Sequence, residues 1–180
     1  MINKLEAVEA HLKRSIMDVP DFPKAGIMFK DISPIFLDHE LCSNITDAFC
    51  NTLEQEPDVI CAIESRGFFF GIMIANQLKK PLIMVRKQGK LPGEVISVSY
   101  DLEYNKGVLE IQKGRISNGA KVLIHDDVLA TGGTAAAAAK LIQQEGGKVS
   151  NFSFLMELEF LNGRNLLTDF SADVLSLVKY

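Results

Sequence analysis

Short apolar runs alternate along the chain with segments of helical periodicity. The apolar runs are rich in β-branched residues and have the length of buried parallel strands; they are residues 58–63, 81–85, 121–125, 148–158 and 173–178. Apolar positions at helical spacing, or a run of alanines, predict helices at residues 5–16, 41–53, 67–78 and 134–144. Strands that alternate with helices indicate an α/β fold with an open, mostly parallel sheet flanked by helices.

Three other segments do not fit that alternation. Residues 94–100 and 107–111 alternate between apolar and polar positions and predict the arms of an antiparallel ribbon. The stretch 87–93 before them is punctuated by glycine and proline, and residues 19–34 are rich in turn formers and predict a loop. No linker or change of composition divides the chain, which favours a single domain of residues 1–180.

The composition narrows the class of protein. The chain has 180 residues, 47% hydrophobic and 23% charged, which is ordinary for one globular domain with a buried core. The formal net charge is −4 and no block of Lys or Arg occurs, which argues against a broad nucleic-acid surface but leaves room for a small phosphorylated ligand. The three cysteines have no C-x-x-C spacing, so neither a disulfide framework nor a zinc site is suggested.

The distribution of apolar residues also bears on location. The first seventeen residues mix charged with apolar positions and lack the uninterrupted apolar stretch of a signal peptide. The longest apolar run, residues 67–75, is far shorter than the roughly 20 residues of a membrane span. We therefore expect a cytoplasmic protein that has no membrane partner.

Residues 122–134, Val-Leu-Ile-His-Asp-Asp-Val-Leu-Ala-Thr-Gly-Gly-Thr, are the most informative stretch for chemistry. The predicted strand delivers two adjacent carboxylates, Asp126 and Asp127, which can accept hydrogen bonds from paired hydroxyls such as those of a ribose. Two glycines within residues 131–134 remove side chains, so that backbone N–H groups can surround a phosphate at the N-terminus of the next helix. Hydroxyl acceptors beside a phosphate cradle suggest a sugar 5-phosphate as the ligand.

A simpler interpretation is that residues 131–134 form only a tight turn with a helix cap, and that the two acids lie in a solvated loop. A lone pair of glycines would favour that interpretation. Here the strand, the acid pair, the glycine pair and the helix start occur together, which favours the phosphate site. The chain contains neither G-x-x-x-x-G-K-[ST] nor G-x-G-x-x-G, so two common nucleotide-binding loops are excluded.

An apolar strand followed by Asp-Asp and Thr-Gly-Gly-Thr resembles the phosphoribosyl-pyrophosphate motif of the type I phosphoribosyltransferases. Further segments resemble the adenine phosphoribosyltransferases in order and spacing; they are Asp-Phe-Pro at 21–23, Phe-Lys-Asp-Ile-Ser-Pro at 29–34, Ser-Arg-Gly-Phe at 65–68, and Arg-Lys-Gln-Gly-Lys-Leu-Pro-Gly at 86–93 with the residues 100–104 that follow. The resemblance covers nearly the whole chain. It implies the type I phosphoribosyltransferase fold and a purine-salvage enzyme that makes AMP and pyrophosphate from adenine and 5-phosphoribosyl 1-pyrophosphate.

The resemblance also implies roles for individual residues. Asp126 and Asp127 would bind the ribose hydroxyls and stabilise positive charge at the anomeric carbon, while Glu103 matches a proposed catalytic carboxylate that acts in proton transfer at the base. The other residues implied to bind phosphoribosyl pyrophosphate or AMP are Arg66, Arg86, Lys87, Lys90, Tyr104, Ala130, Thr131, Gly132, Gly133 and Thr134. Residues 87–104 would form a flexible ribbon that closes over the site and excludes water.

The same resemblance places the base and the partners. Adenine would lie against Phe29, with Met28 and Lys30 nearby, in an N-terminal hood of residues 1–34 that precedes a core of residues 35–180. The family more commonly has Arg at position 30 and Asp at position 64, so Lys30 and Glu64 are departures. Mg²⁺ is implied through the oxygens of the substrate. The family is typically dimeric, which implies a homodimer with the N-terminal helix and the segment around Arg86 as candidate interface elements.

Plainer interpretations stand beside these roles. Arg66 could form a surface ion pair with Glu64, an isolated Phe29 is more often a core residue, and Glu103 is more often a solvent-facing acid. Two other functions also stay open for the whole chain. One is a related enzyme for hypoxanthine, guanine, xanthine or orotate, and the other is a non-catalytic regulator that senses phosphoribosyl pyrophosphate while binding nucleic acid. The regulator would ordinarily need a DNA-binding module or a basic face, and the sequence shows neither.

Overall fold

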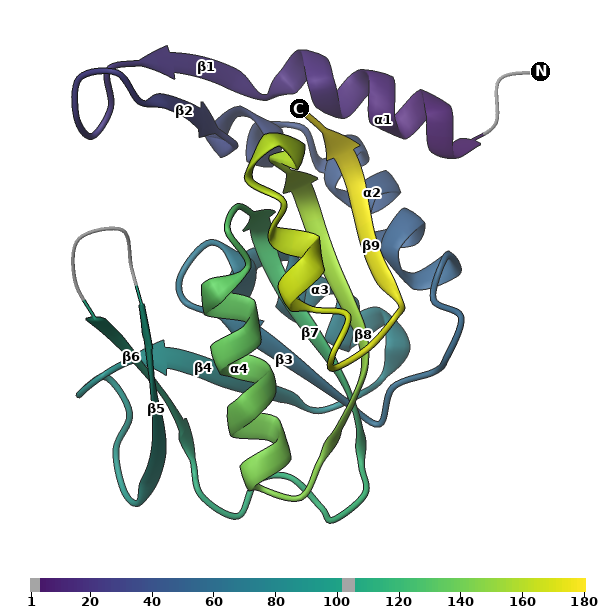
Figure 1. The fold of residues 1–180 in the computed structure, drawn as a ribbon. Helices are drawn as coiled ribbons and strands as arrows, with labels where there is room; N and C mark the ends of the chain where they lie inside the picture. Colours follow the sequence, from purple (N-terminus) through teal and green to yellow (C-terminus); the bar gives the residue numbers. More distant parts are fainter. Residues whose placement is uncertain (1–3, 102–105) are drawn as a thin grey trace. The chain divides into compact units, whose positions relative to one another are not determined.

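The computed structural model describes residues 4–101 and 106–180, which form two compact units, residues 1–51 and 52–180 (Figure 1). The first unit contains α1 (Lys4–Ser15), β1 (Met17–Pro20), β2 (Met28–Asp31), the 3₁₀ helix η1 (Ser33–Leu37) and α2 (His39–Asn51). Both α1 and η1 contact α2. Their apolar stripes bury side chains that include Leu12, Ile35, Leu41, Ile45 and Phe49. The two helices of this unit lie where the apolar periodicity predicts them.

The loop predicted at residues 19–34 is a β-hairpin instead. β1 and β2 pair in antiparallel fashion, with Met17 opposite Asp31 and Pro20 opposite Met28. Its turn is closed by hydrogen bonds from the Phe22 N–H to the Ile27 carbonyl and from the Gly26 N–H to Asp21. The sequence did not reveal these strands because they are four residues long and half-exposed or exposed, so they have no apolar alternation.

The second unit is built on a seven-stranded sheet in the order β5-β6-β4-β3-β7-β8-β9. Its elements are β3 (Val59–Ile63), α3 (Gly67–Leu78), β4 (Leu82–Lys87), β5 (Val95–Asp101), β6 (Lys106–Gln112), β7 (Lys121–Leu129), α4 (Gly133–Gln144), β8 (Lys148–Glu157), η2 (Glu159–Leu161), η3 (Gly163–Leu166) and β9 (Val174–Lys179). The five strands β4, β3, β7, β8 and β9 are parallel. β5 and β6 form an antiparallel ribbon on the edge next to β4. The predicted α/β class and the ribbon are therefore confirmed.

Helices cover the two faces of this sheet, with α4 in front and α3 behind in the view of Figure 1. The burial of β3 shows why both faces must be covered, since all five of its residues are buried. Cys61 and Ile63 belong to the apolar cluster that includes the alanine-rich face of α4. Ala62 faces the other way, and a Cβ added to Gly71 of α3 would lie 2.5 Å from the Ala62 Cβ. Among the described residues no helix is long and apolar enough to cross a membrane.

β7 is longer than the sequence predicts. The strand was expected to end at His125 and to be followed by a loop, yet it runs on to Leu129. Its pairing with β3 does stop at His125, while its pairing with β8 continues to Leu129 opposite Glu157. Asp126 and Asp127 therefore lie on a stretch of strand that extends past the end of β3, at the carboxyl edge of the sheet where ligands bind in open α/β folds.

Candidate active site

A phosphate-sized cavity lies where β7 passes into α4. The connection is residues 130–132, and Gly132 adopts a left-handed conformation with φ of +82° as the N-cap of α4. No side chain caps the helix there, and a cavity of about 110 Å³ adjoins its first turn, lined by residues 128–135 and by Asp126. The first N–H groups of a helix have no partner within the helix and are available to a ligand. The positive end of the helix dipole adds to the attraction of this cavity for an anion. The residues predicted to bind a 5-phosphate, Ala130 to Thr134, all line it.

The two carboxylates of β7 are held in different ways. Asp127 is buried, and its Oδ2 lies 2.8 Å from Nε of Arg66 at the start of α3. Asp126 is half-buried, and its Oδ1 accepts a hydrogen bond of 2.8 Å from the Asp127 N–H. Gly67 allows α3 to come this close, since a Cβ on Gly67 would lie 2.9 Å from the Asp126 Oδ1. Arg66 is thus a partner of the acid pair, which the sequence had not revealed.

Burial makes both carboxyl groups weaker acids. Burial first, and the Asp127 carboxylate second, raise the pKa of Asp126 well above its ordinary value. Burial raises the pKa of Asp127 as well, although the Arg66 guanidinium works in the opposite direction. The positive charge of Arg66 thus offsets part of the cost of burying this pair of acids.

A second, larger cavity of about 370 Å³ adjoins the first, and both are lined by Asp126, Val128 and Thr134. Three acids and two bases line it, namely Glu64, Asp126, Asp127, Arg66 and Lys87. The Tyr100 ring also lines this cavity, a role that the sequence analysis did not assign to it. The ring lies across Gly107 on the paired strand, since a Cβ there would meet ring atoms at 2.5 Å. The glycine opposite an aromatic residue in the ribbon was the available signal.

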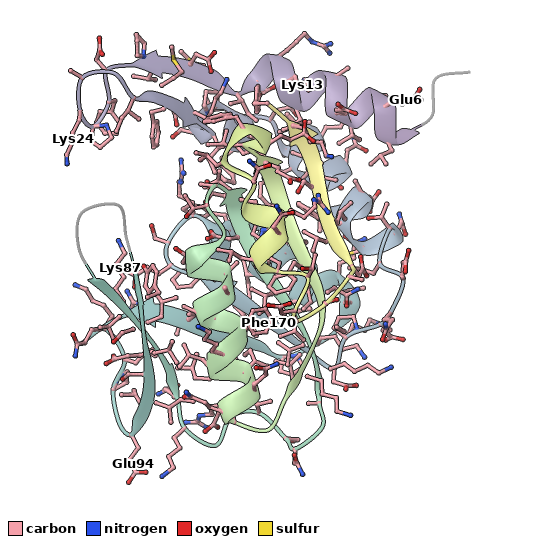
Figure 2. The ribbon with its side chains drawn as sticks, viewed as in Figure 1. Glu6, Lys13, Lys24, Lys87, Glu94 and Phe170 are labelled. Atoms are coloured by element: carbon pink, nitrogen blue, oxygen red, sulfur yellow. The ribbon has the colours of Figure 1, made fainter. Side chains whose placement is uncertain are left out.

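Glu64 binds the two basic residues at the end of β4. Its carboxylate lies 3.2 Å from Arg86 Nε and accepts a hydrogen bond of 3.0 Å from the Lys87 N–H. These contacts keep the pKa of Glu64 below its ordinary value, although burial works the other way. Glu64 is therefore paired with Arg86, and not with Arg66 as the plainer interpretation had it. Lys87, which is labelled in Figure 2, lies opposite Leu109 at the middle of β6.

The turn after Lys87 is held by several hydrogen bonds. Arg86 donates to the Lys90 carbonyl over 3.1 Å, the Gly89 N–H donates to Glu110 over 2.9 Å, and Gln112 donates to the Pro92 carbonyl over 3.0 Å. Lys90 is exposed and is not among the residues that line either cavity. The first part of the expected flexible ribbon is thus fastened to β6 in this structure. Glu103 and Tyr104 lie outside the described residues.

The residues expected near the base lie in the first unit, on β2. Met28 is exposed, and Phe29 and Lys30 are half-buried. Phe29 packs edge-on against Phe22 at a centroid distance of 5.0 Å, and Lys30 Nζ lies 2.6 Å from Asp18. Phe29 is therefore a partly exposed aromatic residue of the hairpin and not part of the buried core.

Comparison with known proteins places this chain in a family. A model described as a phosphoribosyl transferase domain matches residues 37–156. An adenine phosphoribosyltransferase of Mycoplasmopsis fermentans is 53% identical over 170 residues, which are 94% of this chain and 99% of that protein. The chain belongs to the adenine phosphoribosyltransferase family. The resemblance seen in the sequence motifs is thereby confirmed.

Solved structures of the family agree with the fold. The enzyme of Thermoanaerobacter pseudethanolicus is 44% identical and superposes with a TM-score of 0.91, over 96% of this chain and 99% of that one. The Saccharomyces cerevisiae adenine phosphoribosyltransferase, 41% identical with a TM-score of 0.89 over 95% and 98% of the two chains, was solved with an imino-altritol bisphosphate and adenine. The type I phosphoribosyltransferase fold predicted from the motifs is therefore the observed one.

The site offers no cage for a metal ion of its own. Within residues 4–101 and 106–180, no group of three or more His, Cys, Asp or Glu side chains is placed to hold one. The carboxylates of Asp126 and Asp127 line the larger cavity with oxygen atoms, which are the ligands that Mg²⁺ prefers. These residues fit a Mg²⁺ ion that arrives with a phosphorylated substrate and keeps part of its water shell.

Proposed function

We propose that this protein transfers the phosphoribosyl group of 5-phosphoribosyl 1-pyrophosphate to adenine, giving AMP and pyrophosphate in purine salvage. The observation that carries the proposal is the pair of adjoining cavities at the carboxyl end of β7. One adjoins the N-terminus of α4, which suits a 5-phosphate, and the other is lined by carboxylates for the sugar and by cations for a pyrophosphate. In the reaction a bond forms from N9 of adenine to C1 of the ribose, the bond from C1 to pyrophosphate breaks, and N9 loses its proton.

The chain's own residues can divide this work. The loop of residues 130–134 would fix the 5-phosphate, and Asp126 and Asp127 would accept hydrogen bonds from the ribose hydroxyls. The same carboxylates would stabilise the positive charge that develops at C1 as the bond to pyrophosphate lengthens. Arg66 and Lys87 line the same larger cavity as the acids, where they would bind the leaving pyrophosphate.

We propose that Mg²⁺ enters the site bound to the substrate. A Mg²⁺ ion held beside Asp126 and Asp127 would neutralise charge on the leaving pyrophosphate. Asp126 and Asp127 can orient such an ion through its water molecules, while Arg66 is kept for direct contact with the phosphate oxygens.

Several assignments stay predictions from the motifs. Glu103 is proposed to move a proton at the base, and Tyr104 to contact the substrate. Arg86 and Lys90 are proposed to approach the pyrophosphate, although Arg86 is bound to Glu64 here. The segment 1–34, with Met28, Phe29 and Lys30, is proposed as the adenine hood. A cytoplasmic location also stays a prediction.

A panel of nucleobases tests the function directly. Pyrophosphate release is followed with phosphoribosyl pyrophosphate, Mg²⁺ and, in turn, adenine, hypoxanthine, guanine, xanthine and orotate. We expect turnover with adenine and kcat/KM values for the other bases that are lower by about 100-fold or more, because a site that hydrogen-bonds the edge of one base leaves polar groups unpaired with another. A preference for another base would replace the substrate, and binding of phosphoribosyl pyrophosphate without turnover of any base would favour the regulator.

We also propose that the protein acts as a homodimer. Three large apolar side chains of α3 are exposed at helical spacing on one face, namely Phe69, Ile72 and Met73. Met84, which is also exposed, lies on β4 two residues before Arg86. This face adjoins the segment around Arg86, one of the two interface elements expected from the sequence.

A further inference from the structure

The phosphate loop rests directly on a second backbone segment from far along the chain. A Cβ added to Gly132 would collide with the carbonyl oxygen of Gly163, the first residue of η3. In the reverse direction, a Cβ added to Gly163 would collide with the Ala130 carbonyl and would lie 2.8 Å from the Gly132 nitrogen. The two backbones are in contact with no side chain between them, so both positions require glycine for space.

The need for glycine differs between the two positions. Gly132 has a φ of +82°, which by itself disfavours any other residue. Gly163 is not among the described glycines with positive φ, and it begins a 3₁₀ helix. Alanine could therefore adopt the backbone conformation of Gly163, and only the contact with the phosphate loop excludes its side chain.

An ion pair anchors the segment that carries Gly163. Arg164 donates to both carboxylate oxygens of Glu157, over 3.1 and 2.6 Å, and to the Val174 carbonyl over 2.6 Å. Glu157 is buried at the end of β8 and pairs in register with Leu129, the last residue of β7 before the loop. Although burial works the other way, the hydrogen bond from Arg164 holds the pKa of Glu157 below its ordinary value. The carboxylate is therefore charged at neutral pH, and the anchor is a planar, bidentate pair.

We infer that Gly163 and the Arg164–Glu157 pair are positioning residues for the 5-phosphate subsite. They touch no part of the two cavities themselves. They hold residues 130–132 in the shape that aims the first N–H groups of α4 at a phosphate. This inference rests on the proposed function and adds the elements that preorganise its phosphate-binding loop.

Calorimetric titration with two separate ligands tests the inference. Ribose 5-phosphate probes the loop, whereas pyrophosphate with Mg²⁺ probes the side of Arg66 and Lys87. We expect Gly163→Ala to raise the Kd for ribose 5-phosphate by about tenfold or more, since the loop must shift by a methyl group. We expect the Kd for pyrophosphate to stay within about twofold, a split that a general loss of folding does not produce.

Matched variants complete the design. Gly114→Ala is the control, because Gly114 has a φ of +72° and open space around it, so this variant strains a turn without touching the loop. If Gly163→Ala does not fold, the decision passes to Arg164→Ala, which is expected to show the same split, and to Arg164→Lys, which is expected to restore part of the loss. Folded variants with unchanged ribose 5-phosphate affinity, or with both ligands weakened equally, would overturn the inference. A wild-type protein that binds neither ligand would instead overturn the proposed function.

Discussion

The Asp127 carboxylate both pairs with Arg66 and lines the larger cavity. It is buried, and the cavity is the one proposed for the sugar. Removing the charge leaves the guanidinium without this partner and removes an anion from the site where positive charge develops. A loss of either kind is expected to cost more in the transition state than in substrate binding.

The double variant Asp126→Asn/Asp127→Asn tests this at the residue scale. We expect kcat/KM for phosphoribosyl pyrophosphate to fall by about 100-fold or more, the usual effect of removing a group that stabilises transition-state charge. Steady-state kinetics measure the loss, and circular dichroism checks the fold. Asp169→Asn, at an exposed position, is the control. Near-normal kcat/KM in the double variant would refute the role of the acid pair.

At this scale the sequence predicted which residues meet, but not how they pair. The Asp-Asp and Thr-Gly-Gly-Thr motifs predicted that the acids and residues 130–134 lie close together, and these residues line two adjoining cavities. Their role in binding a substrate stays a prediction. The pairing of Arg66 with Asp127, and of Glu64 with Arg86, depends on the order of β4, β3 and β7 in the sheet. That order is set by contacts between distant segments, which local pattern does not contain.

At the scale of elements, the side chain of Glu64, which directly follows β3, binds the end of β4. Its carboxylate holds both the Arg86 guanidinium and the Lys87 N–H, so it sets where Lys87 stands at the cavity. The Glu64 side chain thereby links the end of β3 to the end of the neighbouring strand.

Glu64→Ala should therefore act mainly through substrate binding. We expect KM for phosphoribosyl pyrophosphate to rise by about tenfold, which corresponds to the roughly 1.5 kcal/mol of a hydrogen bond to a charged group, with a smaller change in kcat. Initial-rate kinetics with varied phosphoribosyl pyrophosphate provide the measurement. Glu64→Asp keeps the charge on a shorter side chain and is expected to raise KM by less than the alanine variant does. An unchanged KM in the alanine variant would show that Glu64 does not position Lys87.

Buried elements were predicted more accurately than exposed ones. Buried strands and amphipathic helices were found within a few residues, because burial on two faces or on one stripe imposes a pattern on the sequence. The exposed hairpin of β1 and β2 imposes none and was predicted as a loop. β7 is longer than predicted because the polar Asp126 and Asp127 interrupt the apolar run in the sequence, whereas the pairing with β8 continues to Leu129.

At the scale of the whole molecule, the exposed apolar face of α3, formed by Phe69, Ile72 and Met73, indicates a surface of association. Large apolar patches on soluble proteins mark sites of association, and a second copy of the chain is the partner proposed above. We expect Phe69→Glu/Ile72→Glu to convert a dimer to a monomer, because a buried unpaired charge opposes association. Light scattering after size exclusion measures the mass. Gln144→Glu, an exposed position at the end of α4, is the control, and a monomeric wild type would refute the proposal.

The lengths of the two turns at the carboxyl edge have a consequence for how this chain can vary. Residues 64–66 join β3 to α3, and residues 130–132 join β7 to α4, so each turn is three residues long. Lengthening the first by one residue would rotate the start of α3 and carry the Arg66 guanidinium away from Asp127. Lengthening the second would lift Gly132 off Gly163. Insertions should therefore not be tolerated at either of these turns.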